Sequence, residues 1–123
     1  MYIRFSIYSR RMRTGRLSLH WFHILLSLAD HDLHGLAITK EVFDRTGGQM
    51  HLWPGMLYGA LRKMTEAGLV DEVPPPRDFS AGGGRPKFYR ITPFGRRTCA
   101  EEAERLARVV DAARAKRLIK RPT

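Results

Sequence analysis

The spacing of apolar residues near the start of the chain predicts an amphipathic helix. Ser18 is a suitable N-cap for this helix, which should run to about Ala29. The polar segment 30–32 follows and should end it. The apolar surface is broad enough to face a core. It is formed by Trp21, Phe22, Leu25, Leu26 and Leu28.

A second helix should begin near His34 and Gly35 and continue to about Arg45. Gly47 and Gly48 come directly after it, and glycine is the residue that most often follows the last turn of a helix. The residues expected to supply its apolar contacts are Leu36, Ile38, Val42 and Phe43.

A third helix should start with Pro54 in its first turn, where the missing proline N–H costs nothing. Leu57, Leu61 and Met64 follow at i, i+4 and i+7, so they should form one face directed at the core. Leu69 should close the far end of this core.

The opposite face of the third helix is small, aromatic and cationic. Gly55, Gly59 and Arg62 recur at spacings of four and three, and Tyr58 and Lys63 flank them. Small residues let a helix enter a groove of duplex DNA, a tyrosine can donate to a phosphate, and arginine and lysine can reach phosphates or guanine edges. This face is therefore a candidate DNA-reading surface, with an ordinary solvated helix face as the alternative.

Two short strands are expected after this helix, at residues 69–73 and 87–91. Three prolines at 74–76 prevent the first strand from continuing. Tyr89 and Ile91 alternate along the second strand and should pack inward. Three helices followed by a strand pair predict a mainly α fold with a small β-hairpin, the winged helix-turn-helix.

The connection between the strands is a long loop that should act as the wing. It is stiff at its proline end and carries three glycines at 82–84, followed by Arg85 and Lys87. A flexible loop beside cations suits contact with a phosphate or the minor groove. A glycine run also occurs in plain linkers, so the prediction depends on the position of this loop in the pattern.

Thr92 and Pro93 predict the start of a last helix that continues to about Ile119. One narrow stripe follows this helix at spacings of four and three, which suits packing against a partner helix. With no further domain to cover it, the stripe predicts a homodimer, and folding back onto the first helix is the alternative. The stripe consists of Cys99, Ala103, Leu106, Val110 and Ala113.

The net charge of the chain indicates that the predicted domain binds a negatively charged partner. The 123 residues suffice for one domain with a modest core, and the formal net charge is +10. A field of one sign concentrates opposite charge, so duplex DNA or an anionic membrane surface could be the partner. The longest apolar run, at 24–26, is far shorter than the roughly 20 residues of a membrane span, so we expect double-stranded DNA and no membrane.

The chain divides into a basic N-terminal extension at 1–18, a winged helix-turn-helix domain at 19–92 and a C-terminal dimerisation helix at 93–123. The extension is expected to be either a packed or DNA-embracing arm or a solvated segment. Cys99 is the only cysteine, so no disulfide can form within the chain, and a cytoplasmic setting is expected.

Other chemistry is less well supported by the sequence. His20 and His23 share a helix face, with His31 and His34 nearby, but they form an incomplete ligand set without a cysteine pair, so no metal is expected. We see no carboxylate pair, phosphate loop or partnered nucleophile, and predict neither an enzyme nor a cofactor. Two alternatives stay open: redox sensing by Cys99 across a dimer seam, and a winged helix that docks a protein through its last helix.

The chain resembles the small form of the PadR family of bacterial transcriptional regulators over residues 19–119. The resemblance rests on four segments. They are Leu33-His34-Gly35-Leu36-Ala37-Ile38, Pro54-Gly55-Met56-Leu57-Tyr58 with Leu61, Glu66-Ala67-Gly68-Leu69-Val70, and the stretch from Arg85 through Tyr89-Arg90-Ile91-Thr92-Pro93-Phe94-Gly95-Arg96.

This resemblance implies a winged helix with a C-terminal dimerisation helix that binds a palindromic operator, usually as a repressor, and is released by a small-molecule effector. Tyr58 and the third helix would then read DNA, and the loop with Arg85 would be the wing. Two departures limit the transfer. Leu36 stands where family members commonly have tyrosine, and the last helix contains no aromatic residue after Phe94, so a stacking site for flat ligands is not supported.

Overall fold

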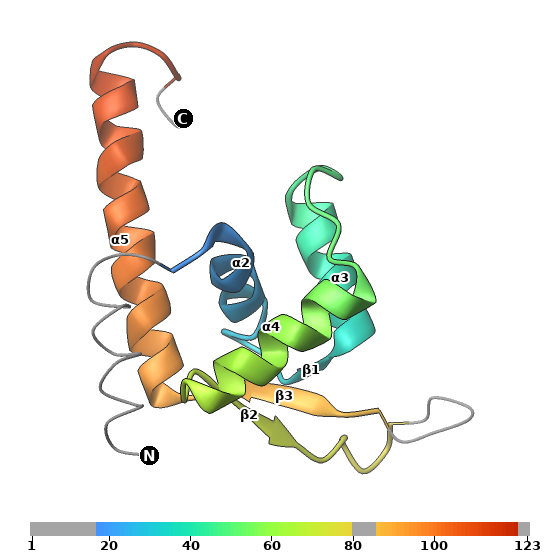
Figure 1. The fold of residues 1–123 in the computed structure, drawn as a ribbon. Coiled ribbons are helices and arrows are strands. Elements are labelled where there is room, and N and C mark those ends of the chain that lie inside the picture. Colours follow the sequence, from blue (N-terminus) through green and yellow to red (C-terminus); the bar gives the residue numbers. More distant parts are fainter. Residues whose placement is uncertain (1–16, 80–85, 121–123) are drawn as a thin grey trace.

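The computed structural model describes residues 17–79 and 86–120, which form a mainly helical domain with one small antiparallel sheet (Figure 1). This architecture confirms the predicted winged helix-turn-helix. Its elements in chain order are α2 (Leu19–Ser27), β1 (Leu33–His34), α3 (Gly35–Arg45), α4 (Pro54–Glu66), β2 (Val70–Val73), β3 (Phe88–Ile91) and α5 (Pro93–Ala115).

Helix α2 begins as predicted. The Ser18 hydroxyl accepts a hydrogen bond from the backbone N–H of Trp21 at 3.1 Å, which satisfies one of the unpaired donors of the first turn. The helix ends at Ser27 instead of Ala29, because the backbone of Leu28 leaves helical geometry (φ −87°, ψ 0°). The Leu28 side chain is nevertheless buried in the core, as expected.

Helix α3 has the predicted bounds, and His34 caps its start. The His34 Nδ1 atom accepts a hydrogen bond from the Ala37 N–H at 3.3 Å. After Arg45 the chain turns through Gly47 and Gly48, whose φ angles of 62° and 82° lie in the left-handed region that glycine adopts without strain.

Two of the four apolar contacts predicted for α3 were wrong. Ile38 and Val42 are fully buried, but Leu36 is 76% exposed and Phe43 is 40% exposed. Leu36 lies two residues from Ile38, and two steps of a helix turn the side chain to the opposite side. Phe43 lies at the edge of the buried face, where its ring packs edge-on against His51.

Helix α4 confirms the predicted division into a core face and an outer face. Pro54 occupies its first turn, and Leu57, Leu61 and Met64 are all buried. Leu69 is buried directly beyond the helix, so the apolar face of α4 and the residue that follows it complete one side of the core.

The sheet has the strand order β1-β3-β2, and all its pairs are antiparallel (Figure 1). Val70 pairs with Ile91 and Val73 with Phe88, which gives the predicted hairpin. Tyr89 and Ile91 are buried, as predicted. The two-residue strand β1 extends this hairpin on its other side and was not expected from the sequence.

Helix α5 starts with the predicted cap. The Thr92 hydroxyl accepts from the Gly95 N–H at 2.9 Å. The helix ends at Ala115 instead of Ile119, because Arg117 adopts φ 63° and the Leu118 N–H bonds back to the Ala113 carbonyl at 2.9 Å. None of the helices in the described ranges has the length and apolarity needed to cross a membrane.

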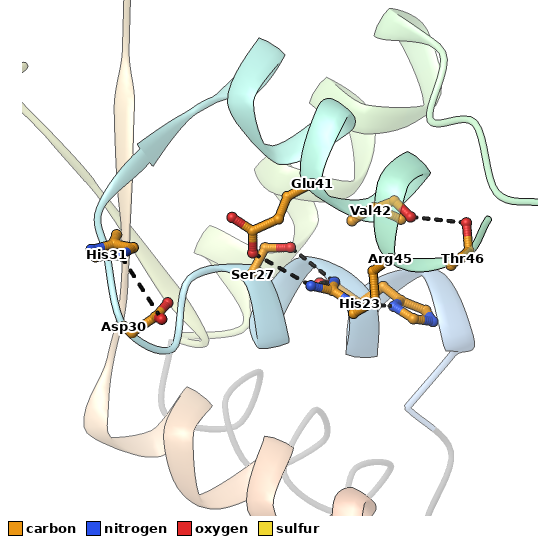
Figure 2. Close-up of polar contacts among 8 residues, drawn as sticks. All are labelled: His23, Ser27, Asp30, His31, Glu41, Val42, Arg45 and Thr46. Carbon is orange, nitrogen blue, oxygen red and sulfur yellow. Dashed lines mark hydrogen bonds and ion pairs between the residues drawn. The ribbon is translucent and has the colours of Figure 1, made fainter. Parts of the chain in front are cut away.

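One arginine ties α3 to α2 (Figure 2). Arg45 donates to the carbonyl of His23 and to the hydroxyl of the fully buried Ser27, both at 2.9 Å, and its Nε donates to His23 Nδ1 at 3.2 Å. Partial burial, followed by the charges of Arg45 and His20, lowers the pKa of His23. The neutral imidazole therefore serves as a structural hydrogen-bond acceptor between the two helices.

Candidate nucleic-acid interface

The outer face of α4 is the first candidate surface, because core packing accounts for only one side of this helix. Gly55, Tyr58, Arg62 and Lys63 are exposed and Gly59 is half-buried, so the structure brings these five predicted residues together on a single accessible helix.

The two glycines of this face make no close packing contact with the described part of the chain. A β-carbon added at Gly55 or at Gly59 would meet no described atom within 4 Å beyond the neighbouring residues and the backbone of the helix itself. Glycine inside a helix costs about 1 kcal/mol relative to alanine. Neither residue is explained by the fold, and both leave the helix backbone open to close approach from outside.

Gly35 shows the opposite case. A β-carbon at this position would lie 2.2 Å from the hydroxyl oxygen of Tyr58, so only glycine lets the Tyr58 ring lie over the start of α3. Tyr58 stays 45% exposed in this position. The contact holds its ring between α4 and the sheet with one side accessible.

Arg62 and Lys63 supply the positive charge of this face, which also carries Glu66 one turn further along α4. Both are exposed, and neither makes a hydrogen bond or an ion pair with any residue in the described ranges. Lys87, at the base of the predicted wing, differs because its Nζ lies 3.7 Å from Glu72 Oε1 on the neighbouring strand. The cations of α4 are thus more available to an external anion than Lys87 is.

An open groove of about 630 Å³ separates α4 from the hairpin. Tyr58 and Arg62 line it from the helix, and Lys87 and Tyr89 line it from the strand side. Burial, followed by the charge of Glu72 and the proximity of Tyr58, raises the pKa of Tyr89, so this phenol remains a neutral donor. The groove joins the two predicted halves of the interface, while Arg85 lies outside the described residues.

An aromatic cluster fixes the start of the wing and was not anticipated from the sequence. The Phe79 ring lies 5.0 Å from that of Phe88 and 5.3 Å from that of His34, measured between centroids. His34 also contacts Phe88 at 5.3 Å. The one sequence feature that could have indicated this anchoring is Phe79, a single aromatic residue in a loop of prolines and charged residues.

The other candidate chemistries find structural roles instead. His23 accepts from Arg45 and His34 caps α3, and no group of three His, Cys, Asp or Glu side chains in the described segments could hold a metal ion. Cys99 is buried, and burial raises the pKa of its thiol, as is typical of a structural cysteine and not of a redox sensor.

The predicted dimerisation stripe begins in the core and runs out of it. Cys99 is buried within its own chain, and Leu106 packs partly against the core. Further along, Val110 is 37% exposed and Ala113 is half-buried, whereas Ala103 is exposed. The start of α5 contacts α2, and its second half projects away from the rest of the described fold (Figure 1).

The sequence matches a family model over the region that contains this interface. The model for the transcriptional regulator PadR-like family matches residues 24–101, which is more than half of the chain. The matched segment includes α3, α4, the hairpin and the beginning of α5.

Solved structures share this fold. The chain is 24% identical to a PadR family transcription regulator from hypervirulent Clostridium difficile R20291, with a TM-score of 0.61 and coverage of 77% of this chain and 96% of that one. It is 21% identical to Bacillus subtilis PadR in complex with operator DNA, with a TM-score of 0.56 and coverage of 65% and 44%.

Two further relatives are similar in sequence. A 37.1 kDa protein in transposon TN4556 from Streptomyces fradiae is 35% identical over 86 residues, which make up 70% of this chain but only 22% of that protein. Protein X from Lysinibacillus sphaericus is 28% identical over 86 residues, which cover 70% of this chain and 76% of that protein.

Proposed function

Because this chain belongs to the PadR-like family of transcriptional regulators, we propose that it binds duplex DNA as a homodimer and represses transcription from an inverted-repeat operator. Members of this family are regulators and not enzymes. The observation that carries the proposal is the outer face of α4, where two glycines unneeded by the fold lie beside two cations without partners in the described chain.

In this proposal α4 enters the major groove. Arg62 contacts guanine edges or phosphate, Lys63 contacts phosphate, and Tyr58 donates from the rim of the groove beside the hairpin. Gly55 and Gly59 let the helix backbone come close to the bases. The formal net charge of +10 favours binding to a polyanion in general, and the α4 face adds the geometry for a specific complex.

The wing forms the second contact with DNA. Lys87 stands at its base, and approach of a phosphate would compete with Glu72 for its ammonium group. Arg85 is assigned here from the sequence alone. Together these cations would contact the backbone or the minor groove next to the site occupied by α4.

Helix α5 is the proposed dimer element. Its 23 residues correspond to about 34 Å of helix at 1.5 Å per residue, and its second half carries Val110 and Ala113 away from the core. Pairing of two such helices would bury the accessible part of the stripe, from Ala103 to Ala113. The two α4 helices would then face major grooves about 34–36 Å apart on one side of the DNA.

Release from DNA by a small molecule completes the proposal. A ligand bound near the paired α5 helices would change the separation of the two α4 helices and weaken operator binding, with a coupling on the order of 1–3 kcal/mol. Spin labels on the two α4 helices would report this change, and a ligand that released DNA at constant separation would contradict it. The proposal includes a cytoplasmic location, because a protein that binds an operator must share a compartment with the chromosome.

The proposal is tested by selection from a random duplex library at near-physiological salt. The wild-type protein should recover an inverted repeat, and a variant with Arg62→Ala and Lys63→Ala should lose it. The matched control removes one arginine and one lysine from the second half of α5 and its end, Arg108→Ala and Lys116→Ala, and should retain the motif. Recovery of no motif by the wild type would favour docking of a protein instead.

A further inference from the structure

Two large apolar side chains at the start of α4 are exposed without a role in the core. Trp53, the N-cap residue, is 61% exposed, and Met56 in the first turn is 46% exposed. The core face of the same helix is complete without them, because Leu57 and Leu61 are buried. Both residues flank Gly55, whose missing β-carbon opens the helix backbone to outside approach.

Trp53 is unsuited to the structural task of its position. N-cap residues are usually Ser, Thr, Asp or Asn, whose side chains accept a backbone hydrogen bond, and Trp53 makes no such bond. Its ring instead stacks on His51, with centroids 4.0 Å apart and planes 11° apart. The stack holds the indole in a defined orientation at the surface.

Met56 lies on the other side of Gly55 along the helix. It lines a shallow open hollow between α4 and α2, together with Trp21, Gly59 and Lys63. Met56 therefore lies beside Lys63, one of the two cations proposed to contact DNA. Its thioether is accessible along the same edge of α4.

The side chains in the first turn of α4 limit which bases this turn can recognise. Pro54, Gly55 and Met56 carry no strong hydrogen-bonding side-chain group, and Trp53 carries a single indole N–H donor, so these side chains supply neither a bidentate contact to guanine or adenine nor a strong acceptor for cytosine. The one apolar group in the major groove is the 5-methyl group of thymine. The N-terminal residues of a recognition helix are also those that reach base edges.

We propose that the first turn of α4 reads the 5-methyl group of thymine through Met56 and Trp53. This specificity rests on the proposed binding of duplex DNA, and it adds to that proposal a preference for thymine at the bases facing this turn. Arg62, two turns further along, would supply the polar contacts of the same half-site.

The test uses the inverted repeat selected by the wild-type 123-residue protein, resynthesised with deoxyuridine in place of thymidine at one half-site position at a time. Deoxyuridine pairs like thymidine but lacks the methyl group. Loss of one buried methyl contact should weaken binding about fourfold at each position that is read, by the transfer free energy of one CH₂ group. Binding of labelled duplexes is measured by fluorescence anisotropy.

Variants assign the effect to its residues. Met56→Ala and Trp53→Ser are both compatible with the start of a helix, and serine adds a capping side chain, so both variants should fold. In these variants the affinity difference between thymidine and deoxyuridine should disappear at the position that each residue reads. Leu19→Ala, which removes an exposed apolar side chain from α2, should leave the difference intact.

The outcomes separate this inference from the proposed function. Wild-type binding that is equal for thymidine and deoxyuridine at every position would overturn thymine reading and leave DNA binding in place. A methyl effect that persists in both variants would overturn the assignment to Met56 and Trp53. Failure of the wild type to select any motif would instead overturn the proposed function.

Discussion

Replacement of Gly59 by alanine should make the protein more stable and its binding to DNA weaker. The added β-carbon would meet no atom of residues 17–79 and 86–120 within 4 Å beyond its own stretch of helix, so the substitution introduces no clash with them. Alanine is favoured over glycine in a helix interior by about 1 kcal/mol. For a chain of this size that gain should raise the midpoint of thermal unfolding by roughly 3–5 °C.

The same methyl group would stand between α4 and the bases if the helix approaches them closely. Forcing an extra carbon into a close-packed contact typically costs about 1–3 kcal/mol. The dissociation constant for the selected operator should therefore rise by about 5- to 150-fold. Differential scanning calorimetry measures the first effect and fluorescence anisotropy the second, both on the same preparation.

Gly95 provides the control of opposite sign. Its β-carbon would lie 2.1 Å from the backbone carbonyl oxygen of Leu69, which cannot move aside as a side chain can, so Gly95→Ala should lower the unfolding temperature. A Gly59→Ala protein that binds the operator with wild-type affinity would refute close approach at this position. One that unfolds at a lower temperature than wild type would refute the inference that the space beside Gly59 is open.

Three further outcomes are expected. Because phosphate contacts release counterions, Arg62→Ala should lower the slope of log K against log salt concentration by about 0.9 if Arg62 contacts phosphate, and an unchanged slope would exclude that contact. Burial, followed by the charges of Arg45 and His20, lowers the pKa of His23 in the folded protein. The neutral imidazole therefore stabilises the fold fully above its ordinary pKa of about 6.5, and this stabilisation is lost as the pH falls toward the lower folded pKa. The urea midpoint should drop between pH 7.5 and pH 5.5, and His23→Gln should make that drop smaller; an equal drop in both proteins would contradict the sign. Val110→Asp should yield a monomer in sedimentation equilibrium and abolish binding to the inverted repeat, whereas a stable dimer would place the interface elsewhere.

The elements defined by local patterns could be predicted from the sequence. Ser18 and Thr92 act as N-caps as expected, because a cap depends on bonds to residues three positions away. The buried face of α4 likewise follows from one helical period, with Leu57 and Leu61 one turn apart. These features determine which side of α4 is left accessible.

The features that depend on distant residues could not be predicted. Strand β1 exists only because Leu33 and His34 pair with β3, more than fifty residues along the chain. The place of Tyr58 over Gly35 and the contact of Phe79 with Phe88 also arise from packing between separate elements. Helical periodicity alone does not give these neighbours, which set the shape of the groove between α4 and the wing.

The central claim, that α4 lies in the major groove of an inverted repeat, is tested most directly by affinity cleavage. An iron–EDTA group is attached to a cysteine introduced by Thr65→Cys, an exposed position of α4 that leaves Met56, Arg62 and Lys63 in place. Buried Cys99 should stay unlabelled, and the parent protein controls for it. We expect cleavage within each half-site, in two clusters about 10 base pairs apart. The same group attached through Arg108→Cys on α5 should cleave weakly or not at all. Strong cleavage from α5 with none from α4 would contradict the claim.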